Sequence, residues 1–226
     1  MNVPSYPHPS SRKKSNVDYE ITTLGELRNY VASDLYRYMT STSTKAFIRG
    51  WYIAVFRYTF FMRCCKYFAA KGPLSKPLFL ICRIALRHYS VKYGFQIPWQ
   101  TSIGPGLSIG HHGAIIVNPN SKIGTNCNIS VGVLLGLNHK IDAQGQSLGF
   151  EYPEIGDRVS LGNNAKVIGG VSIGDDCMIG VSAVVTKDMP PKSVCVGIPA
   201  KVISQQGSGA FVGSFHPFTL TRKFCQ

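Results

Sequence analysis

The sequence predicts an α+β protein in which a helical N-terminal domain precedes a parallel β-helix of stacked hexapeptides. Three observations predict this class. Aliphatic residues recur at every sixth position in the C-terminal half, glycine often follows them, and the N-terminal half shows helical spacing instead. A period of six fits neither a helix, with a period of about 3.6, nor an ordinary strand, with a period of about two. Sustained over many repeats, it is typical of coils that stack to bury their apolar faces.

Residues 1–22 make up the first predicted segment. They are rich in Pro and Ser and carry the basic run Arg12, Lys13 and Lys14. No apolar core of a signal peptide follows this run. We therefore expect a disordered basic arm over residues 1–22.

Residues 23–94 are predicted to form an α-helical domain of three helices. Thr23 and Glu26 fit a capping box, in which each side chain satisfies an N–H group of the first turn. A stripe of apolar residues at helical spacing predicts a second helix over 45–70. Pro77 suits the first turn, and Gly94 the C-terminal cap, of a third helix over 76–93.

Positive charge dominates the composition, with 24 Lys and Arg against 11 Asp and Glu and a formal net charge of +13. Such a surplus favours anionic partners: nucleotide phosphates, acidic polysaccharide or a membrane surface. The longest apolar stretch is too charged to span a membrane, because it contains Arg49, Arg57, Arg63 and Lys66. Its aromatic stripe is expected to pack helices or subunits, and the alternative is peripheral membrane contact with snorkelling arginines. Nucleic acid is not an expected partner, because the sequence shows no recognised binding module.

The seven cysteines are scattered, odd in number and without a CxxC pair; they are Cys64, Cys65, Cys82, Cys127, Cys177, Cys195 and Cys225. This pattern favours reduced thiols over a disulfide framework or a zinc site. We expect no bound metal and a cytoplasmic location, with the inner face of the membrane as the alternative.

Residues 95–203 are predicted to form the β-helix. Each hexad supplies one short flat face with its aliphatic side chain inside the prism, and glycine permits the tight corner. The inward positions are Ile97, Ile103, Ile109, Val117, Ile123, Ile129, Leu135, Ile155, Leu161, Val167, Ile173, Ile179 and Val185.

The hexad register breaks twice, and departures from a repeat are where sites are expected. Two extra residues follow Ile109, in a bulge that contains His111 and His112. The second break is an insertion of residues 136–154, which must leave the prism as a loop. Residues 204–226, rich in Gly and Ser and then aromatic and basic, are expected to form a flexible tail or to dock onto a neighbour.

Sequence motifs within and before the prism point to a known family. They are Ile103-Gly-Pro-Gly-Leu-Ser-Ile-Gly-His-His-Gly-Ala-Ile-Ile-Val-Asn-Pro119, residues 123–132, Val196-Gly-Ile-Pro-Ala-Lys-Val202, Leu35-Tyr-Arg-Tyr38 and Arg87-His-Tyr-Ser-Val-Lys-Tyr-Gly94. Together they resemble hexapeptide-repeat acyltransferases of the serine O-acetyltransferase type, and more closely their relatives in exopolysaccharide and capsule pathways. The resemblance covers residues 23–203. It implies a left-handed β-helix, acetyl-CoA as co-substrate, and homotrimers or dimers of trimers with active sites between adjacent prisms.

The resemblance also implies an active site. His111 takes the place of the family's catalytic histidine, and we expect it to deprotonate the acceptor hydroxyl for direct attack on acetyl-CoA. His139 of the inserted loop is a candidate acceptor ligand that reaches across a subunit interface. His112 points away from its neighbour and is expected to have no chemical role. The positions that match the family's cofactor slot are Asn164, Ala165, Gly180, Ser182, Lys187 and Lys201, with the two lysines at the phosphates or pantetheine.

One departure from serine O-acetyltransferases concerns the base. Those enzymes carry an aspartate before the first coils that orients the histidine, and here Pro98 stands in its place. Either the dyad is incomplete or a carboxylate of the loop replaces the aspartate, namely Asp142, Glu151 or Glu154.

A second departure concerns the acceptor. The family's Arg-His-Pro, which reads the serine carboxylate, is replaced here by Glu151-Tyr152-Pro153. A carboxylate facing Glu151 would be repelled rather than paired, and Tyr152 suits the face of a sugar. We therefore expect Glu151 and Tyr152 to contact an uncharged hydroxyl compound.

The leading hypothesis is an acetyl-CoA-dependent O-acetyltransferase that acts on a sugar hydroxyl in surface polysaccharide biosynthesis. The alternative is serine O-acetyltransferase of cysteine biosynthesis. A zinc hydratase would need three converging histidines, and His111, His112 and His139 lack the expected spacing. A non-catalytic scaffold is the remaining alternative. The absence of a P-loop and of a GxGxxG motif gives nucleotide hydrolysis and dinucleotide binding no support.

Overall fold

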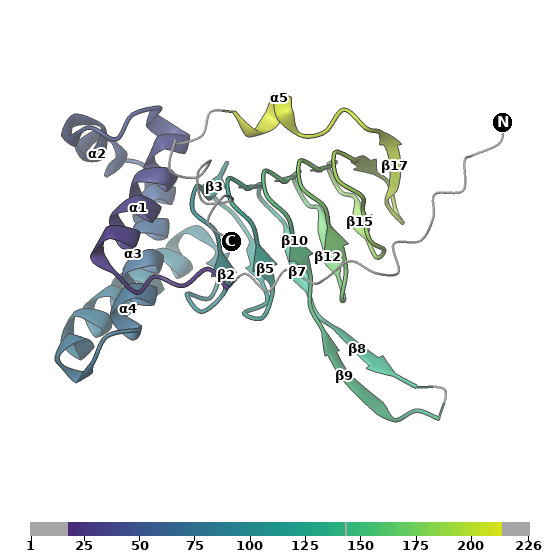
Figure 1. Ribbon diagram of the computed structural model, residues 1–226, viewed down its shortest axis with the longest axis horizontal. Coiled ribbons are helices and arrows are strands. Elements are labelled where there is room, and N and C mark those ends of the chain that lie inside the picture. The colour runs from purple at the N-terminus through teal and green to yellow at the C-terminus, as the bar shows by residue number, and fades with distance from the viewer. Residues whose placement is uncertain (1–17, 143, 214–226) are drawn as a thin grey trace.

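The computed structural model describes residues 18–142 and 144–213. Helices come first: α1 (Leu24–Met39), α2 (Thr44–Gly50), α3 (Ala54–Ala69), the 3-10 helix η1 (Pro73–Ser75) and α4 (Lys76–Tyr93). From Phe95 onward the chain forms short strands that stack into a prism beside the helices (Figure 1). The predicted α+β class is confirmed.

The helix ends follow local sequence signals. Thr23 accepts a hydrogen bond from the Glu26 N–H, and Glu26 binds back to the Thr23 N–H, so the predicted capping box is confirmed. Pro77 lies in the first turn of α4, and Gly94 ends that helix with a φ of 75°. Within the described part of the chain, no helix combines the length and hydropathy that crossing a membrane requires.

The predicted second helix is two helices. Helix α2 ends at Gly50, and the Ile53 N–H donates to the Gly50 carbonyl at 2.8 Å, which closes a turn before α3. This turn folds α2 back onto α3, so the rings of Phe47 and Trp51 lie 6.1 and 5.3 Å from that of Phe60. The prediction of one continuous helix is wrong because glycine weakens a helix, and the turn places these aromatic rings in contact.

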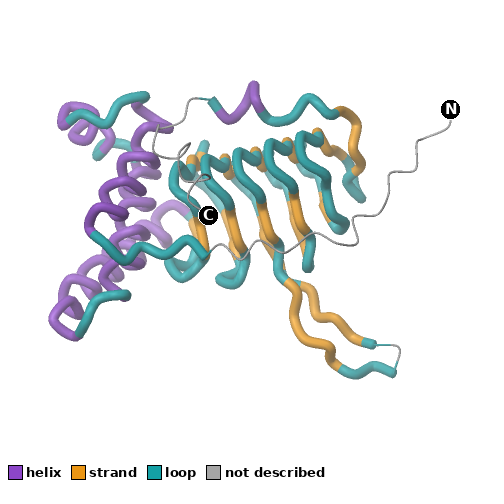
Figure 2. The backbone as a smooth tube through the Cα atoms, in the orientation of Figure 1, coloured by secondary structure: helices purple, strands orange, loops and turns teal. Residues whose placement is uncertain are grey.

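Three sheets form the faces of the prism, and their strands are parallel except at one end of the third sheet (Figure 2). The first sheet contains β1 (Phe95–Gln96), β4 (Ile115–Val117), β7 (Leu134–Gly136), β12 (Lys166–Ile168) and β15 (Val184–Val185). The second contains β2 (Ser102–Ile103), β5 (Lys122–Ile123), β10 (Glu154–Ile155) and β13 (Ser172–Ile173). The third contains β3 (Ser108–Ile109), β6 (Asn128–Ile129), β11 (Ser160–Leu161), β14 (Met178–Ile179), β16 (Val194–Val196) and the antiparallel β17 (Lys201–Ser204).

The predicted inward positions are confirmed. Each of the thirteen aliphatic side chains at period six is at most 4% exposed. The register places similar residues above one another in successive coils, as in the second sheet, where Ile155 pairs with Ile123 and Ile173. Because each coil covers the apolar side chains of the next, stacking supplies the core that one coil lacks.

The inserted loop is a β-hairpin. Strands β8 (Asn138–Ile141) and β9 (Ser147–Glu151) pair antiparallel and project away from the prism (Figure 1). Four of its large apolar side chains are 41–59% exposed; they are Leu137, Ile141, Leu148 and Phe150. The sequence predicted the excursion of residues 136–154 but not its strand pairing.

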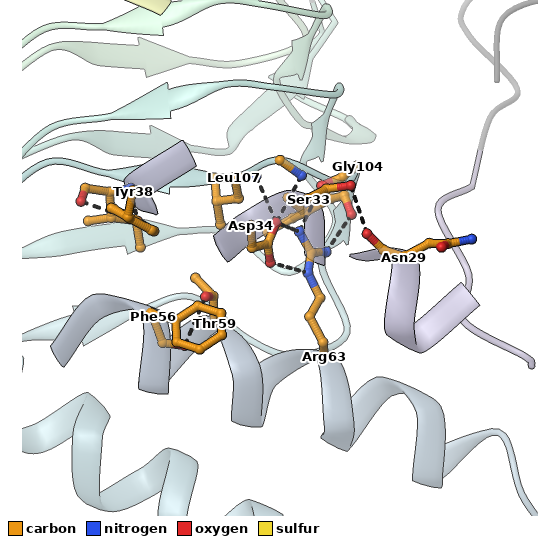
Figure 3. A network of polar contacts seen from close by, with 12 residues as sticks. Asn29, Ser33, Asp34, Tyr38, Phe56, Thr59, Arg63, Gly104 and Leu107 are labelled. Carbon is orange, nitrogen blue, oxygen red and sulfur yellow. Dashed lines mark hydrogen bonds and ion pairs between the residues drawn. The ribbon is translucent and has the colours of Figure 1, made fainter. Parts of the chain in front are cut away.

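A buried ion pair joins the helices to the first coil (Figure 3). Arg63 of α3 donates to both oxygens of Asp34 of α1, at 2.9 and 3.2 Å, and both side chains are at most 2% exposed. Asp34 also accepts the backbone N–H groups of Gly106 and Leu107, both at 2.9 Å. Arg63 donates further to the carbonyl groups at positions 103 and 104, both at 2.7 Å. Each charge is therefore paired and hydrogen-bonded, as burial requires.

Both ends of the described chain pack onto the prism. The arm was expected to extend to residue 22, yet Ile21 is fully buried and the Tyr19 N–H donates to Ser102 Oγ at 2.9 Å. The tail was expected from residue 204, yet β17 and α5 (Gly209–Val212) return along the prism toward the helices (Figure 1). Asn128 anchors that return by donating to the Phe211 carbonyl at 2.6 Å. The rest of both predicted segments, 1–17 and 214–226, lies outside the described residues.

Candidate active site at an edge of the prism

His111 and His112 lie on an exposed turn that joins β3 to β4. The end of α4 holds this turn, because the Gly113 N–H donates to the Tyr93 carbonyl at 3.0 Å. Gly113 has a φ of 141°, and a Cβ there would collide with the side chain of Val131, so the turn requires glycine. The helices therefore fix the backbone that carries His111.

Tyr38 of α1 fixes the strand that leads into the same turn. Its hydroxyl accepts the Ile109 N–H at 2.8 Å and donates to the Ile109 carbonyl at 3.4 Å. Burial raises the pKa of Tyr38 well above its ordinary value, so the hydroxyl stays protonated and keeps its donor role.

The two histidines of the turn have different surroundings. The ring of His112 lies 4.7 Å from that of Tyr93 and meets Phe95 edge-on at 6.4 Å. Among the residues that the structure describes, none forms a hydrogen bond, ion pair or ring contact with the His111 side chain. An exposed imidazole without such contacts can accept a proton from a bound ligand.

The turn of His111 belongs to the prism edge between the third and first sheets. This His111 edge comprises residues 110–114, 130–133, 162–165, 180–183 and 197–200. Asn164 and Ser182 lie exposed on it, at the left-handed φ values of 60° and 57°. Backbone hydrogen bonds join successive coils here, from Gly132 to Ala114 at 2.6 Å, Asn164 to Val131 at 2.8 Å and Ser182 to Asn163 at 2.8 Å. The structure therefore places two predicted cofactor residues on the edge that carries His111.

Ala165 and Gly180 lie on the same edge but are buried. Ala165 is fully buried, its N–H donates to the Gly162 carbonyl at 3.1 Å, and its carbonyl accepts from Leu134 at 3.0 Å. The Gly180 N–H donates to the Cys195 carbonyl at 2.7 Å. The Ala165 carbonyl and the Gly180 N–H join neighbouring coils, and the Ala165 N–H closes a turn within its own coil. The two residues therefore shape the edge and offer no polar side chain to a ligand.

The two predicted lysines lie apart from each other. Lys201 begins β17, directly after residues 197–200, and Ala200 donates to the Val184 carbonyl at 2.8 Å on the His111 edge. Lys187 follows β15, on the edge between the first and second sheets. Both lysines are exposed. Within one chain, Lys201 lies next to the His111 edge and Lys187 borders the opposite side of the first sheet.

The predicted acceptor residues lie on or beside the hairpin, which arises from the same edge as Lys187. The hairpin leaves the prism between the first and second sheets, so it arises from another edge than His111. His139 lies 2.8 Å from Ser147 Oγ, and its ring lies 5.0 Å from that of Phe150. Glu151 forms an ion pair with Lys140 at 3.1 Å, and Tyr152 is half-buried at the hairpin base. A single chain does not bring these residues to His111.

The loop carboxylates expected to orient His111 have other roles in the chain. Asp142 accepts the N–H groups of Gln144 and Gln146, at 2.9 and 2.8 Å, and so closes the hairpin turn. Glu151 pairs with Lys140, and Glu154 belongs to β10 in the second sheet. Each therefore lies away from the His111 edge of its own chain.

Gln96 is the polar residue near the turn that sequence reasoning missed. It follows Phe95, whose ring contacts His112, and it pairs with Ile116 at the start of the first sheet. Its side chain is exposed, whereas Phe95 and Ile97 on either side are buried. Pro98 lies one corner further on, between β1 and β2. The alternation of apolar and polar residues was the signal for an outward amide here.

The cysteines offer no accessible nucleophile. All six in the described residues are free and buried. Burial raises the pKa of Cys177 to about 11 and that of Cys127 to about 12, which keeps both thiols protonated at neutral pH. Among the described residues, no group of three His, Cys, Asp or Glu side chains is placed to hold a metal ion.

Comparisons with known proteins agree with the prism. The family described as "Bacterial transferase hexapeptide (six repeats)" matches residues 152–187. A serine acetyltransferase of Mycobacterium tuberculosis is 36% identical over 126 residues, which are 56% of this chain and 52% of the relative. A serine acetyltransferase of Helicobacter pylori is 38% identical over 112 residues, 50% of this chain and 62% of the relative. The chain thus spans between half and two thirds of these curated relatives.

Solved structures show the same fold. Serine acetyltransferase from Brucella abortus aligns with a TM-score of 0.59 at 20% identity, over 82% of this chain and 70% of that one. Soybean serine acetyltransferase complexed with serine aligns with a TM-score of 0.57 at 23% identity, over 78% and 69%. These relatives do not support the expected closeness to polysaccharide-pathway enzymes, because each of them is a serine acetyltransferase.

Proposed function

We propose that this chain is an acetyl-CoA-dependent O-acetyltransferase with His111 as its general base. The observation that carries the proposal is the exposed, uncommitted imidazole of His111 on the prism edge that also presents Asn164 and Ser182. Imidazole suits the role because its ordinary pKa lies near neutral pH. The similarity to curated serine acetyltransferases supports the same reaction class.

The proposed reaction needs one proton acceptor and one proton donor. His111 removes the proton of the acceptor hydroxyl as that oxygen attacks the thioester carbonyl of acetyl-CoA. When the carbon–sulfur bond breaks, the imidazolium returns the proton to the leaving sulfur. The products are the acetyl ester and CoA, so atoms and charge balance. Gly113 and Tyr38 fix the turn, which contributes to catalysis because the base is oriented before substrate binds.

The acetyl-CoA slot is proposed to follow the His111 edge. Asn164 and Ser182 supply exposed polar groups along it, and Lys201 supplies a cation beside it. Lys187 borders another edge. It would reach a cofactor bound between two prisms only if the neighbouring copy presented that edge. We therefore propose a homotrimer, or a dimer of trimers, of left-handed prisms, in which each hairpin approaches the His111 edge of the next copy.

The acceptor that the relatives support is L-serine. The sequence favoured a sugar hydroxyl, because Glu151 would repel a carboxylate. In the structure, Lys140 lies 3.1 Å from Glu151 and offsets its charge, so this objection weakens. Lys140 itself is a cation that a serine carboxylate can bind.

A sugar hydroxyl is the second candidate, and one observation favours it. Phe150 is 56% exposed at the hairpin, beside the ring of His139. An exposed aromatic face next to hydrogen-bonding groups suits a sugar as well as a protein partner.

An acceptor assay separates these candidates. Purified protein is incubated with acetyl-CoA and either L-serine or a panel of nucleotide sugars and oligosaccharides, and mass spectrometry follows CoA release and the acetylated product. We expect O-acetylserine. A product only with sugars would support the second candidate, and no product with any hydroxyl compound would contradict O-acetyl transfer.

A further inference from the structure

Helix α4 is apolar on faces that no other part of the described chain covers. Of its eighteen residues, only Cys82 and Leu86 are buried. Five of its large apolar side chains are 50–71% exposed; they are Leu78, Leu80, Ile81, Ile84 and Val91. A helix that packs through a narrow stripe is expected to be polar elsewhere. The exposed apolar faces therefore indicate contact with something beyond this chain.

A groove runs between α4 and the first sheet. Its volume is about 1090 Å³, with Leu80 and Ile84 on the helix side and Trp99 and Ile116 on the sheet side. Ile84 is 63% and Ile116 42% exposed, so apolar atoms line both walls. The groove is thus an extension of the exposed apolar face of the helix.

Cations accompany this apolar surface without acidic neighbours. Arg83 and Arg87 line the groove one helical turn apart, and both are exposed. Lys76 and Lys92 stand at the two ends of the helix. No Asp or Glu occurs anywhere between Asp34 and Asp142. Among the described residues, no carboxylate forms an ion pair with these four cations.

We propose that α4 and the groove behind it bind the surface of an anionic lipid bilayer. The exposed aliphatic side chains would enter the boundary between headgroups and acyl chains, while Arg83 and Arg87 bind lipid phosphates. Arginine suits this role because its planar fork binds phosphate in a bidentate manner. Trp99 lies at the same surface, where amphipathic rings favour the headgroup region.

Charge complementarity favours lipid over a second copy of this chain. A copy carries a formal net charge of +13, so its surface is dominated by the same sign as α4. Most acids in the described residues are already paired, including Asp34, Asp176 and Glu151. An anionic bilayer supplies both the apolar medium and the negative charge that the α4 surface lacks.

Vesicle co-sedimentation tests the proposal without any substrate, so its outcome is independent of the acetyl-transfer assay. The full chain is mixed with phosphatidylcholine vesicles, with or without phosphatidylglycerol. We expect binding to the anionic vesicles only, with a loss at high salt. Equal binding to both vesicle types, or binding to neither, would overturn the proposal.

Two double variants locate the contact. Arg83→Gln with Arg87→Gln should lower the partition coefficient about 25-fold, because each basic residue near an anionic surface contributes roughly five-fold. Arg28→Gln with Lys192→Gln removes the same charge from exposed positions outside α4 and should change the partition coefficient little. Equal losses in the two variants would mean that net charge, and not this surface, binds the lipid.

A third variant separates lipid from self-association. Ile81→Ser with Ile84→Ser changes two exposed side chains, so thermal unfolding should stay close to that of the parent chain. Vesicle binding should fall while the mass from light scattering stays constant. A drop in mass would make this face a contact between copies and would refute the lipid proposal.

Discussion

Asp34 and Arg63 form a buried ion pair, 2.9 Å from Nε to Oδ2, that also binds four backbone groups of the first prism coil. Arg63→Met keeps an unbranched apolar stem but removes the guanidinium, which leaves the Asp34 carboxylate buried without a counter-charge. We expect a loss of about 3–5 kcal/mol in the free energy of unfolding, measured by urea denaturation. Arg49→Met, at an exposed position, should cost less than about 0.5 kcal/mol. If both variants lost equally little free energy of unfolding, the ion pair would not hold the helices to the prism.

Gly113 and Gly110 provide a matched pair of substitutions around His111. Gly113→Ala places a methyl group against Val131 at a φ of 141°, whereas nothing lies within 4 Å of a Cβ at Gly110. We expect Gly113→Ala to cost about 1–3 kcal/mol of stability and to lower turnover, because the turn must move. The free energy of unfolding of Gly110→Ala should lie within about 0.5 kcal/mol of that of the parent chain. If Gly113→Ala kept full stability and turnover, the turn would not need this backbone conformation.

Tyr38→Phe removes the hydroxyl that binds Ile109 just before the turn. The Ile109 N–H then loses its partner in a buried setting, which costs about 1–3 kcal/mol. If Tyr38 positions His111, turnover should fall while the Michaelis constant for acetyl-CoA stays nearly unchanged. A change in that Michaelis constant with normal turnover would assign Tyr38 to cofactor binding instead.

Stability should decline at alkaline pH because burial raises the pKa of several thiols. The pKa of Cys177 rises to about 11, and those of Cys65, Cys127 and Cys195 rise to about 12. Their contribution is complete below the ordinary thiol pKa of about 9 and is lost as pH rises through the folded values, since the unfolded chain releases these protons first. The melting temperature should therefore fall between about pH 9 and pH 11.

Cys127→Ser gives the control for this effect, because serine does not titrate in that range. Its melting temperature should depend less on pH than that of the parent chain. The slope of the free energy of unfolding against pH should be smaller by up to about 1.4 kcal/mol per pH unit. An unchanged slope would show that the buried thiols do not cause the alkaline loss.

The prism could be predicted from the sequence because its signal is local and repeated. Each coil satisfies the same rule, so an inward residue such as Ile129 is identified by its neighbours six positions away. The capping box at Thr23 was equally local. The break after Gly50 was missed because the apolar stripe continues through it, and only the ring contacts of Trp51 explain why the chain turns.

Long-range pairings left no comparable signal. Arg63 interrupts an apolar stretch, and from the sequence it counted only as a charge against a membrane span. In the structure it is 2% exposed, because Asp34, twenty-nine positions earlier, pairs with it. From the sequence, Glu151 was treated as an unpaired charge. Its pairing with Lys140 depends on the register of the hairpin, which the sequence did not specify. The candidate site shows the same limit: His111 was found by motif, but the edge it occupies followed only from the stacking of the coils.

The most direct test of the proposed mechanism compares His111→Ala with His112→Ala in acetyl transfer to L-serine. His111→Ala should lower turnover by a factor of about 10² or more, as expected for loss of a general base, with acetyl-CoA affinity nearly intact by calorimetry. His112→Ala should retain most of the turnover, since that ring packs against Tyr93. Near-normal turnover of His111→Ala would contradict its role as the base.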